Sequence, residues 1–266
     1  MLEIRDIRKT FHPGTVNEKI ALDGVSLTLE TGQFVTVIGG NGAGKSTMLN
    51  AVAGTLPIDS GSIVLDGVDI THMPEYRRAK YLGRVFQDPM MGTAGDMWIE
   101  ENLALAAMRG KRRGFRWGVK KEDREFFRQQ LATLELGLED RLTVKTRLLS
   151  GGQRQALTLL MAALEKPKLL LLDEHTAALD PGTAEKVLAI TRQTVEAYSI
   201  TCLMITHNMQ SALDLGNRTI MMDDGRVIYD VSGEERAHLT IHDLTARFRD
   251  ARGRELDNDR MLLGNV

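Results

Sequence analysis

A glycine-rich run that ends in a lysine and a serine is the part of the sequence best suited to chemistry. Residues 39–47 match the spacing G-x-x-x-x-G-K-[ST]. Glycines let successive backbone N–H groups turn toward one anion, and the lysine adds a positive charge. We therefore predict a site for nucleotide phosphates, with Lys45 at the β- and γ-phosphates and the Ser46 hydroxyl on Mg²⁺. The residues predicted to bind the nucleotide are Gly39, Gly40, Asn41, Gly42, Ala43, Gly44, Lys45, Ser46 and Thr47.

The segments on either side of this loop are those that a phosphate-binding loop requires. Residues 33–38 form an apolar run that predicts a buried strand, and residues 46–53 predict the start of a helix. The helix would direct the positive end of its dipole at the phosphates. A glycine-rich turn with a chance lysine is the alternative, and the flanking strand and helix disfavour it.

Two carboxylates follow a second apolar run. Residues 169–172 are all leucine and predict a buried parallel strand, and Asp173 and Glu174 follow at its carboxyl end, where open α/β sheets bind ligands. Phosphoryl transfer needs a metal ion and an oriented water. We expect Asp173 to contact Mg²⁺ and Glu174 to polarise the attacking water. A strand that ends in surface acids is the alternative, and the phosphate-binding loop upstream disfavours it.

A second glycine-bearing segment precedes a helical run that begins at residue 154. Ser150 is a good helix N-cap, and the two glycines after it permit close approach to the backbone. The pattern predicts a second helix N-terminus suited to phosphate, with an ordinary capped helix as the alternative. The residues of this segment are Leu149, Ser150, Gly151, Gly152 and Gln153.

The rest of the chain alternates between strand and helix patterns. Residues 1–35 alternate apolar and polar, which predicts antiparallel strands. Helices are predicted over 99–108 and 123–136. After residue 168 the order strand, helix, strand predicts a parallel sheet covered by helices. The later elements are a helix over 184–198, a strand over 199–205 and a hairpin over 219–229.

The composition is that of an ordinary globular protein, with 266 residues, 42% of them hydrophobic, and a net charge of −2. A broad basic face for nucleic acid would usually make the net charge more positive. The lone Cys202 lies in an apolar run, so we expect a buried thiol in a reducing compartment. The charged residues Glu3 and Arg5 argue against a signal peptide, and no apolar run is long enough to predict a membrane span.

With these motifs, the chain resembles the ATP-binding-cassette (ABC) ATPases from residue 2 to about residue 235. Residues 149–153 match the LSGGQ signature of that family without a change. The further matches are Phe11 at the adenine-stacking position, Gln87 in the Q-loop, Ala178, Leu179 and Asp180 in the D-loop, and His207 as the switch histidine.

The resemblance implies an α/β fold. It consists of a P-loop NTPase core with a mainly parallel sheet, an N-terminal antiparallel β-subdomain and an inserted helical subdomain. A single ABC ATPase domain is expected over residues 1–240, with the helical subdomain at about 90–160. A short C-terminal extension is expected over residues 241–266.

The resemblance also implies a mechanism. Two copies would pair head to tail around two ATP molecules, so that Lys45 and Ser46 of one copy face Ser150 and Gly152 of the other, with the D-loop at the dimer contact. The residues with implied catalytic roles are Lys45, Gln87, Glu174 and His207, and those implied to hold Mg²⁺ are Ser46, Gln87 and Asp173.

The partners implied by the resemblance are integral membrane permease subunits on separate chains. Phrases in residues 11–19, 87–93 and 173–180 are similar to a bacterial import group labelled for tryptophan, tyrosine or general amino acids, which works with an extracytoplasmic solute-binding protein. The ATPase would then be peripheral, bound through the permease at the cytoplasmic face of the inner or plasma membrane. No nucleic acid is expected as a partner.

Two other functions fit the same motifs. One is a soluble ABC ATPase without a permease, with a role on nucleic acid or in cofactor assembly, which partner identity would distinguish from a transporter. The other is a degenerate ATP-binding scaffold, which is disfavoured because Lys45, Asp173, Glu174 and His207 are all present.

Two features of the sequence have open roles. His175 stands where most family members carry proline. We expect catalysis to be kept and the imidazole to alter the pH dependence, which an unchanged pH–rate profile in His175→Pro would contradict. Residues 111–118 combine basic and aromatic residues, which fits either a solvated loop or contact with a permease or lipid headgroups.

Overall fold

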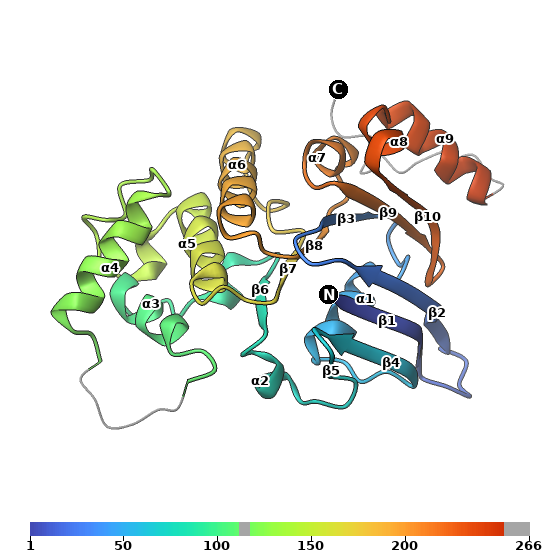
Figure 1. Ribbon diagram of the computed structural model, residues 1–266, viewed down its shortest axis with the longest axis horizontal. Helices are drawn as coiled ribbons and strands as arrows, with labels where there is room; N and C mark the ends of the chain where they lie inside the picture. The colour runs from blue at the N-terminus through green and yellow to red at the C-terminus, as the bar shows by residue number, and fades with distance from the viewer. Residues whose placement is uncertain (112–117, 253–266) are drawn as a thin grey trace. The chain divides into compact units, whose positions relative to one another are not determined.

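The computed structural model describes residues 1–111 and 118–252, with side chains as far as residue 250. These residues form two units. Figure 1 shows the chain coloured by residue number, from blue at the N-terminus to red at the C-terminus. The first holds residues 1–78 together with the chain from residue 200 onward, and the second holds residues 79–199. The basic–aromatic segment lies outside the described residues except at its ends, as does the C-terminal extension after residue 252.

The first unit contains an antiparallel sheet with the strand order β2-β1-β4-β5. Alternate residues, such as Leu2 and Ile4 on one strand and Leu27 and Leu29 on the next, are buried, because successive side chains of a strand point to opposite faces. The predicted antiparallel N-terminal part is thereby confirmed. The strands are β1 (Leu2–Phe11), β2 (Lys19–Leu29), β4 (Ser60–Leu65) and β5 (Val68–Asp69).

The first unit also contains strands of a mainly parallel sheet, in the order β10-β9-β3-β8. β3 (Phe34–Ile38) pairs in parallel with β8 (Cys202–Ile205) and β9 (Arg218–Asp223), whereas β10 (Arg226–Ser232) runs antiparallel to β9. Every residue of β3 and β8 is buried, including Cys202, as expected for strands covered on both faces. The helices are α1 (Lys45–Ala53), α2 (Glu75–Arg78), α7 (Met209–Asp214), α8 (Gly233–Ala237) and α9 (Ile241–Arg252).

The second unit pairs β6 (Leu82–Val85) in parallel with β7 (Leu169–Asp173). A bidentate ion pair ties two of its helices together, since Arg124 donates to both carboxylate oxygens of the buried Glu100, at 2.7 and 2.9 Å. Its helices are α3 (Ile99–Ala107), α4 (Lys121–Ala132), α5 (Gly151–Ala163) and α6 (Pro181–Tyr198), with 3₁₀ turns η1 (Pro89–Gly92) and η2 (Thr146–Leu148).

Parallel strands with covering helices and a separate antiparallel sheet confirm the predicted α/β class. In the ranges that the structure describes, no helix combines the length and the apolar character needed to cross a membrane.

Several element boundaries differ from the prediction: the helix predicted over 123–136 is α4, and the helical run predicted from residue 154 begins at Gly151. Two further differences have clear local causes. The helix predicted over 184–198 begins at Pro181, because the Asp180 carboxylate accepts a 3.0 Å hydrogen bond from the Thr183 N–H and proline fits the first helical position. The strand predicted over 199–205 begins at Cys202, because Ser199 takes a left-handed conformation that ends α6.

A buried arginine holds the C-terminal end of α1. Arg78 is 3% exposed, and its guanidinium donates to the carbonyls of Ala51 and Val52 at 2.7 and 2.8 Å. Two further bonds reach the carbonyls of Thr71 and Met73 at 3.0 and 2.7 Å. A cation is favourable beside the last carbonyls of a helix, and burial lowers the pKa of this arginine. The helix that begins at Lys45 is therefore anchored at its far end.

We predict that Arg78→Met destabilises the protein by about 3 kcal/mol or more, because several buried carbonyls lose a charged donor. Arg77→Met is the matched control, since Arg77 is the neighbouring residue on α2 and is exposed, and we expect a change of about 0.5 kcal/mol or less. Urea denaturation of both variants measures this. Equal midpoints for the two variants would contradict the anchoring role.

Candidate functional site

The glycine-rich loop runs between β3 and α1, pressed against backbone from distant parts of the chain. A Cβ at Gly39 would lie 2.2 Å from the Met222 carbonyl oxygen, and one at Gly44 would lie 2.5 Å from that of Ala21. Gly44 also has a φ of +95°, which residues with a side chain rarely adopt. No side chain fits at either position, so the loop depends on glycine for close approach as well as for turning.

The hairpin between β9 and β10 fixes the other side of the loop. The Gly225 N–H donates to the Ala43 carbonyl at 3.1 Å, and the Asp23 N–H donates to the Gly225 carbonyl at 2.9 Å. The Asp23 carboxylate also accepts from Arg8 and Arg226, and the hydrogen bond from Arg226 lowers its pKa. The sequence predicted the hairpin but gave no sign that it supports the phosphate-binding loop.

The start of α1 has the electrostatics of an anion site. Lys45 is buried, and its ammonium donates to the Gly39 and Gly40 carbonyls at 2.7 and 3.0 Å. The N-cap residue Gly44 has no side chain with which to cap the helix, and no acidic residue lies in the first turn, where Ser46 is exposed. Uncapped N–H groups, the positive end of the helix dipole and a lysine therefore converge where a phosphate would bind.

The two remaining predicted residues of the first unit lie at the ends of strands. Phe11 ends β1, is partly buried, and pairs across the sheet with Lys19. His207 follows β8 and precedes α7, whose N-cap is Asn208. The Asn208 side chain accepts a 2.9 Å hydrogen bond from the Ser211 N–H, so His207 lies at a strand-to-helix turn of defined geometry.

The second unit holds the predicted acidic residues. Asp173 ends β7, and Arg84 on the adjacent strand β6 brings its guanidinium to 3.9 Å from the Asp173 carboxylate. Glu174 follows with a φ of +46°, a left-handed conformation that is strained for a residue with a side chain. Gln87, exposed, comes shortly after the end of β6.

The histidine that departs from the family pattern is buried. His175 is 2% exposed, and its Nε2 lies 3.0 Å from the Thr191 hydroxyl on α6. Burial lowers the pKa of this imidazole to about 4. The His175 imidazole is therefore neutral above about pH 5 and adds no titration step to the pH–rate profile in that range. The change in pH dependence that we expect of His175 does not follow from its charge.

The signature segment forms a capped helix start. The Ser150 hydroxyl accepts from the Gln153 N–H, and the Gln153 side chain accepts from the Ser150 N–H, both at 3.3 Å. This reciprocal capping satisfies two N–H groups at the start of α5. A Cβ at Gly152 would lie 2.1 Å from the Thr183 methyl on α6, and one at Gly151 would lie 3.2 Å from Leu179. The two glycines therefore also let α5 pack on the D-loop and on α6.

The predicted residues fall into two groups. The first unit brings the loop over residues 39–47 against the hairpin and β2, and holds Phe11 and His207. The second unit brings the signature, the D-loop and Thr183 into contact, and holds Gln87, Asp173 and Glu174. Thr183 was missed because its role depends on packing between two helices.

Residues 22–177 match the family model of the ABC transporter. The chain belongs to this family. It is an ATP-binding cassette with ATPase activity, which confirms the resemblance and the predicted binding of ATP.

Known cassettes match over nearly the whole chain. The tyrosine transport ATP-binding protein of Clostridioides difficile is 42% identical over 253 residues, which cover 93% of this chain and 98% of the relative. The methionine import ATP-binding protein of Corynebacterium efficiens is 36% identical over 234 residues, 85% of this chain and 61% of the relative. A dimeric cassette solved in a post-hydrolysis state with ADP and Pi superposes with a TM-score of 0.74 at 29% identity, covering 87% of this chain and 98% of that one.

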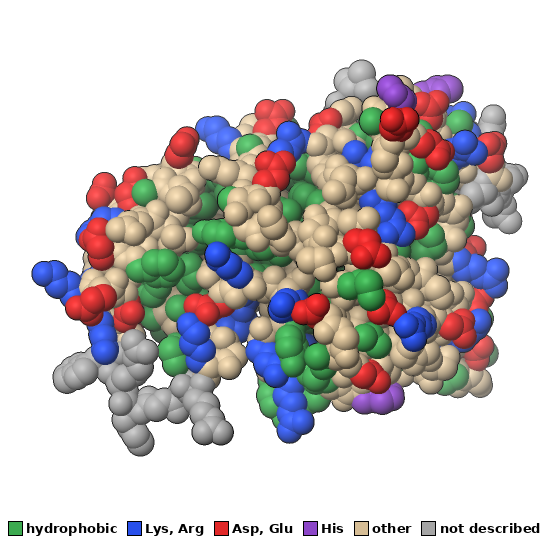
Figure 2. All heavy atoms as spheres, viewed as in Figure 1, with side chains coloured by type: hydrophobic (Ala, Val, Ile, Leu, Met, Phe, Trp, Pro, Cys, Tyr) green, Lys and Arg blue, Asp and Glu red, His purple; other side chains and the backbone are tan. Residues whose placement is uncertain are grey.

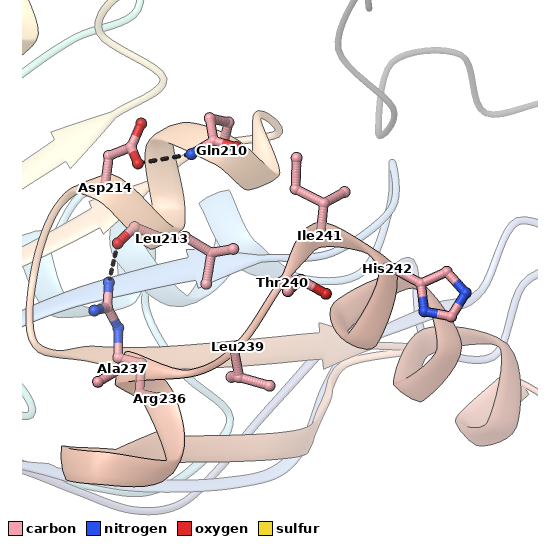
Figure 3. A pocket seen from close by; sticks show the side chains of 9 residues that line it. All are labelled: Gln210, Leu213, Asp214, Arg236, Ala237, Leu239, Thr240, Ile241 and His242. Atoms are coloured by element: carbon pink, nitrogen blue, oxygen red, sulfur yellow. Dashed lines mark hydrogen bonds between the residues drawn. The ribbon is translucent and has the colours of Figure 1, made fainter.

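The cassette also has a cavity of about 540 Å³ beside α7, α8 and the start of α9 (Figure 3). Arg236 on its wall donates to the Leu213 carbonyl at 3.0 Å, and Gln210 donates to Asp214 at 2.7 Å. None of the residues that line it belongs to the predicted ATP site. Its polar groups hold α7 in place, and we assign the cavity no ligand.

We predict that Gly152→Ala destabilises the cassette by about 1–3 kcal/mol, because the added methyl overlaps the Thr183 methyl. Adding Thr183→Ser, which removes that methyl, should recover part of the loss, so that the two changes are not additive. Thermal or urea denaturation of the single and double variants measures this. Gly182→Ala is the control, because its Cβ would meet only Asp180 at 3.8 Å. Full additivity of the two changes would contradict the packing role.

Proposed function

We propose that the chain is the ATP-hydrolysing subunit of an importer for a small solute such as an amino acid. The observation that carries this proposal is the 42% identity to a tyrosine transport ATP-binding protein along almost the full length of both chains. Other relatives are import ATP-binding proteins named for methionine, spermidine/putrescine and thiamine. The cargo itself would be selected by the permease and by an extracytoplasmic solute-binding protein.

In this proposal the first unit supplies the groups that bind ATP. Phe11 stacks on adenine, and the N–H groups of residues 39–47 bind the phosphates. Lys45 exchanges its hydrogen bonds to the loop carbonyls for the β- and γ-phosphates, and His207 contacts the γ-phosphate. The loop supports this, because the start of its helix has no acidic residue in the first turn and a buried lysine beside it.

The second unit supplies Glu174, Gln87 and Asp173 for hydrolysis. Glu174 polarises the attacking water, and Gln87 senses the metal and passes closure to the helical subdomain. Ser46, Gln87 and Asp173 would hold Mg²⁺, which neutralises developing phosphate charge when bound. The donor set of a hydroxyl, an amide and a carboxylate suits this oxygen-seeking cation.

Dimerisation completes the proposed site. Leu149, Ser150, Gly151, Gly152 and Gln153 of one copy would face the ATP on the other copy, with Ala178, Leu179 and Asp180 at the contact. The solved dimeric cassette with ADP and Pi supports this arrangement for a related chain. We place a single ATPase domain over residues 1–240, including the helical part at about 90–160, followed by the extension over 241–266.

Exposed apolar side chains support a permease partner. Met90 and Met91 follow Gln87 closely and are 62% and 67% exposed. Trp98 and Leu105 are also exposed, before and within α3. Exposed apolar residues on neighbouring segments favour contact with a protein partner. The ATPase would then be peripheral at the cytoplasmic face of the inner or plasma membrane. On the face shown in Figure 2, acidic and basic side chains are intermixed.

We predict that Glu174→Gln lowers ATP turnover by about 10²-fold or more while ATP binding is kept, because the amide cannot act as a base. Expressed with its genomic neighbours and purified in ATP, this variant should form dimers that bring polytopic membrane proteins with them. Glu185→Gln on the exposed side of α6 is the control. A dimer that purifies alone, or with nucleic acid, would refute the proposed transport function and would favour a soluble ABC ATPase without a permease.

We predict that Met91→Glu reduces recovery of the cassette with the permease, because a charge would replace an apolar contact. ATP turnover of the isolated chain should stay within about twofold, as for other exposed substitutions. Ile20→Glu is the matched control, because Ile20 is an exposed apolar residue of β2 in the other unit. Equal membrane recovery for both variants would count against this surface.

A further inference from the structure

The backbone after β7 turns sharply at Glu174. This residue has a φ of +46°, and its carbonyl accepts a 2.9 Å hydrogen bond from the Ala177 N–H. The next turn closes from Leu179 N–H to the Thr176 carbonyl at 3.1 Å. A left-handed residue with a side chain persists only where its surroundings hold it there. The contacts on either side of Glu174 therefore decide where its carboxylate lies.

The contact that follows Glu174 directly is made by His175. Its side chain enters the core, where it is 2% exposed, and reaches Thr191, which is fully buried in α6. The Nε2 atom of the imidazole lies 3.0 Å from the Thr191 hydroxyl. The chain immediately after Glu174 is thus joined to a helix interior rather than to solvent.

The hydrogen-bond pattern fixes the direction of this contact. The Thr191 hydroxyl donates its one proton to the Val187 carbonyl at 2.8 Å. It can therefore only accept from His175, so the imidazole carries its proton on Nε2. A buried donor that loses its acceptor is costly, so removal of the Thr191 hydroxyl must move the imidazole or leave its N–H unpaired.

We propose that His175 is a positioning residue for ATP hydrolysis. By donating to Thr191 it fastens the backbone behind Glu174 to α6, and so holds the Glu174 carboxylate at the angle needed to orient water. The proposal rests on the proposed role of Glu174. His175 touches neither ATP nor water in this account and acts only through the peptide that joins it to Glu174.

The test compares Thr191→Val with Thr191→Ser in the full-length protein. Valine keeps the volume and removes the acceptor, whereas serine keeps the hydroxyl. We expect Thr191→Val to lower kcat for ATP on the order of tenfold with KM unchanged, because misplacement of a reacting group affects the chemical step. Thr191→Ser should retain most of the activity. His175→Gln, which can still donate from a similar position, should fall between wild type and His175→Leu.

A second comparison separates positioning from general destabilisation. Thr71→Val is the matched control, because Thr71 is also buried and its hydroxyl pairs with the backbone of Ile63, in the other unit. It should lower stability without lowering kcat. In a Glu174→Gln background, Thr191→Val should change the residual rate by less than about twofold, because no carboxylate remains to be positioned.

The outcomes are distinct. Full activity of Glu174→Gln would overturn the proposed catalytic role of Glu174, on which this proposal rests, and would leave the importer function to be tested by co-purification. Loss of activity in Glu174→Gln together with unchanged kcat in Thr191→Val would overturn the role of His175 alone. An equal loss from Thr191→Val in both backgrounds, or an equal loss in Thr191→Ser, would show a structural effect and would also overturn it.

Discussion

The phosphate-binding loop has its shape because backbone from two distant segments presses on its glycines. The carbonyls of Ala21 in β2 and Met222 in β9 occupy the space in which side chains at Gly44 and Gly39 would lie. A loop that binds phosphate through its N–H groups must be ordered before the ligand arrives, since ordering it on binding would cost affinity. The N-terminal sheet and the C-terminal hairpin therefore help to shape the predicted nucleotide site, although the glycine-rich loop itself lies outside both.

Two helices that begin at or just after a predicted site residue, α1 at Lys45 and α7 after His207, are also held at their far ends. Arg78 donates to the Ala51 and Val52 carbonyls near the end of α1. Arg236 donates to the carbonyls of Ala212 and Leu213 near the end of α7, and Figure 3 marks the bond to Leu213. Burial lowers the pKa of both arginines. A guanidinium suits this position because it can donate to several carbonyls at once. In each case a cation stabilises the C-terminal end of a helix whose N-terminal end follows a predicted site segment.

The sequence predicted what is local or carried by a motif. The strand before Gly39, the helix after Gly44 and the strand before Asp173 follow from short patterns of apolar residues and glycine, and all three are confirmed. The contacts of Arg78 and Thr183 could not be predicted, because each depends on two elements that meet only in the folded chain. His175 was visible only as a departure from a pattern, and its partner lies in the middle of α6.

Packing at the start of α5 couples two motifs that the sequence presents as separate. Gly151 and Gly152 leave no gap toward Leu179 and Thr183, and close-packed contacts transmit displacement rather than absorb it. A shift of the signature toward or away from a nucleotide must therefore move the D-loop or the first turn of α6. Glu174 precedes the D-loop by a short turn, and the His175 side chain contacts Thr191 of the same helix. We therefore expect the signature, the D-loop and Glu174 to move together. Within the second unit, the glycines of the signature thus have a packing role in addition to the predicted one of leaving room for phosphate.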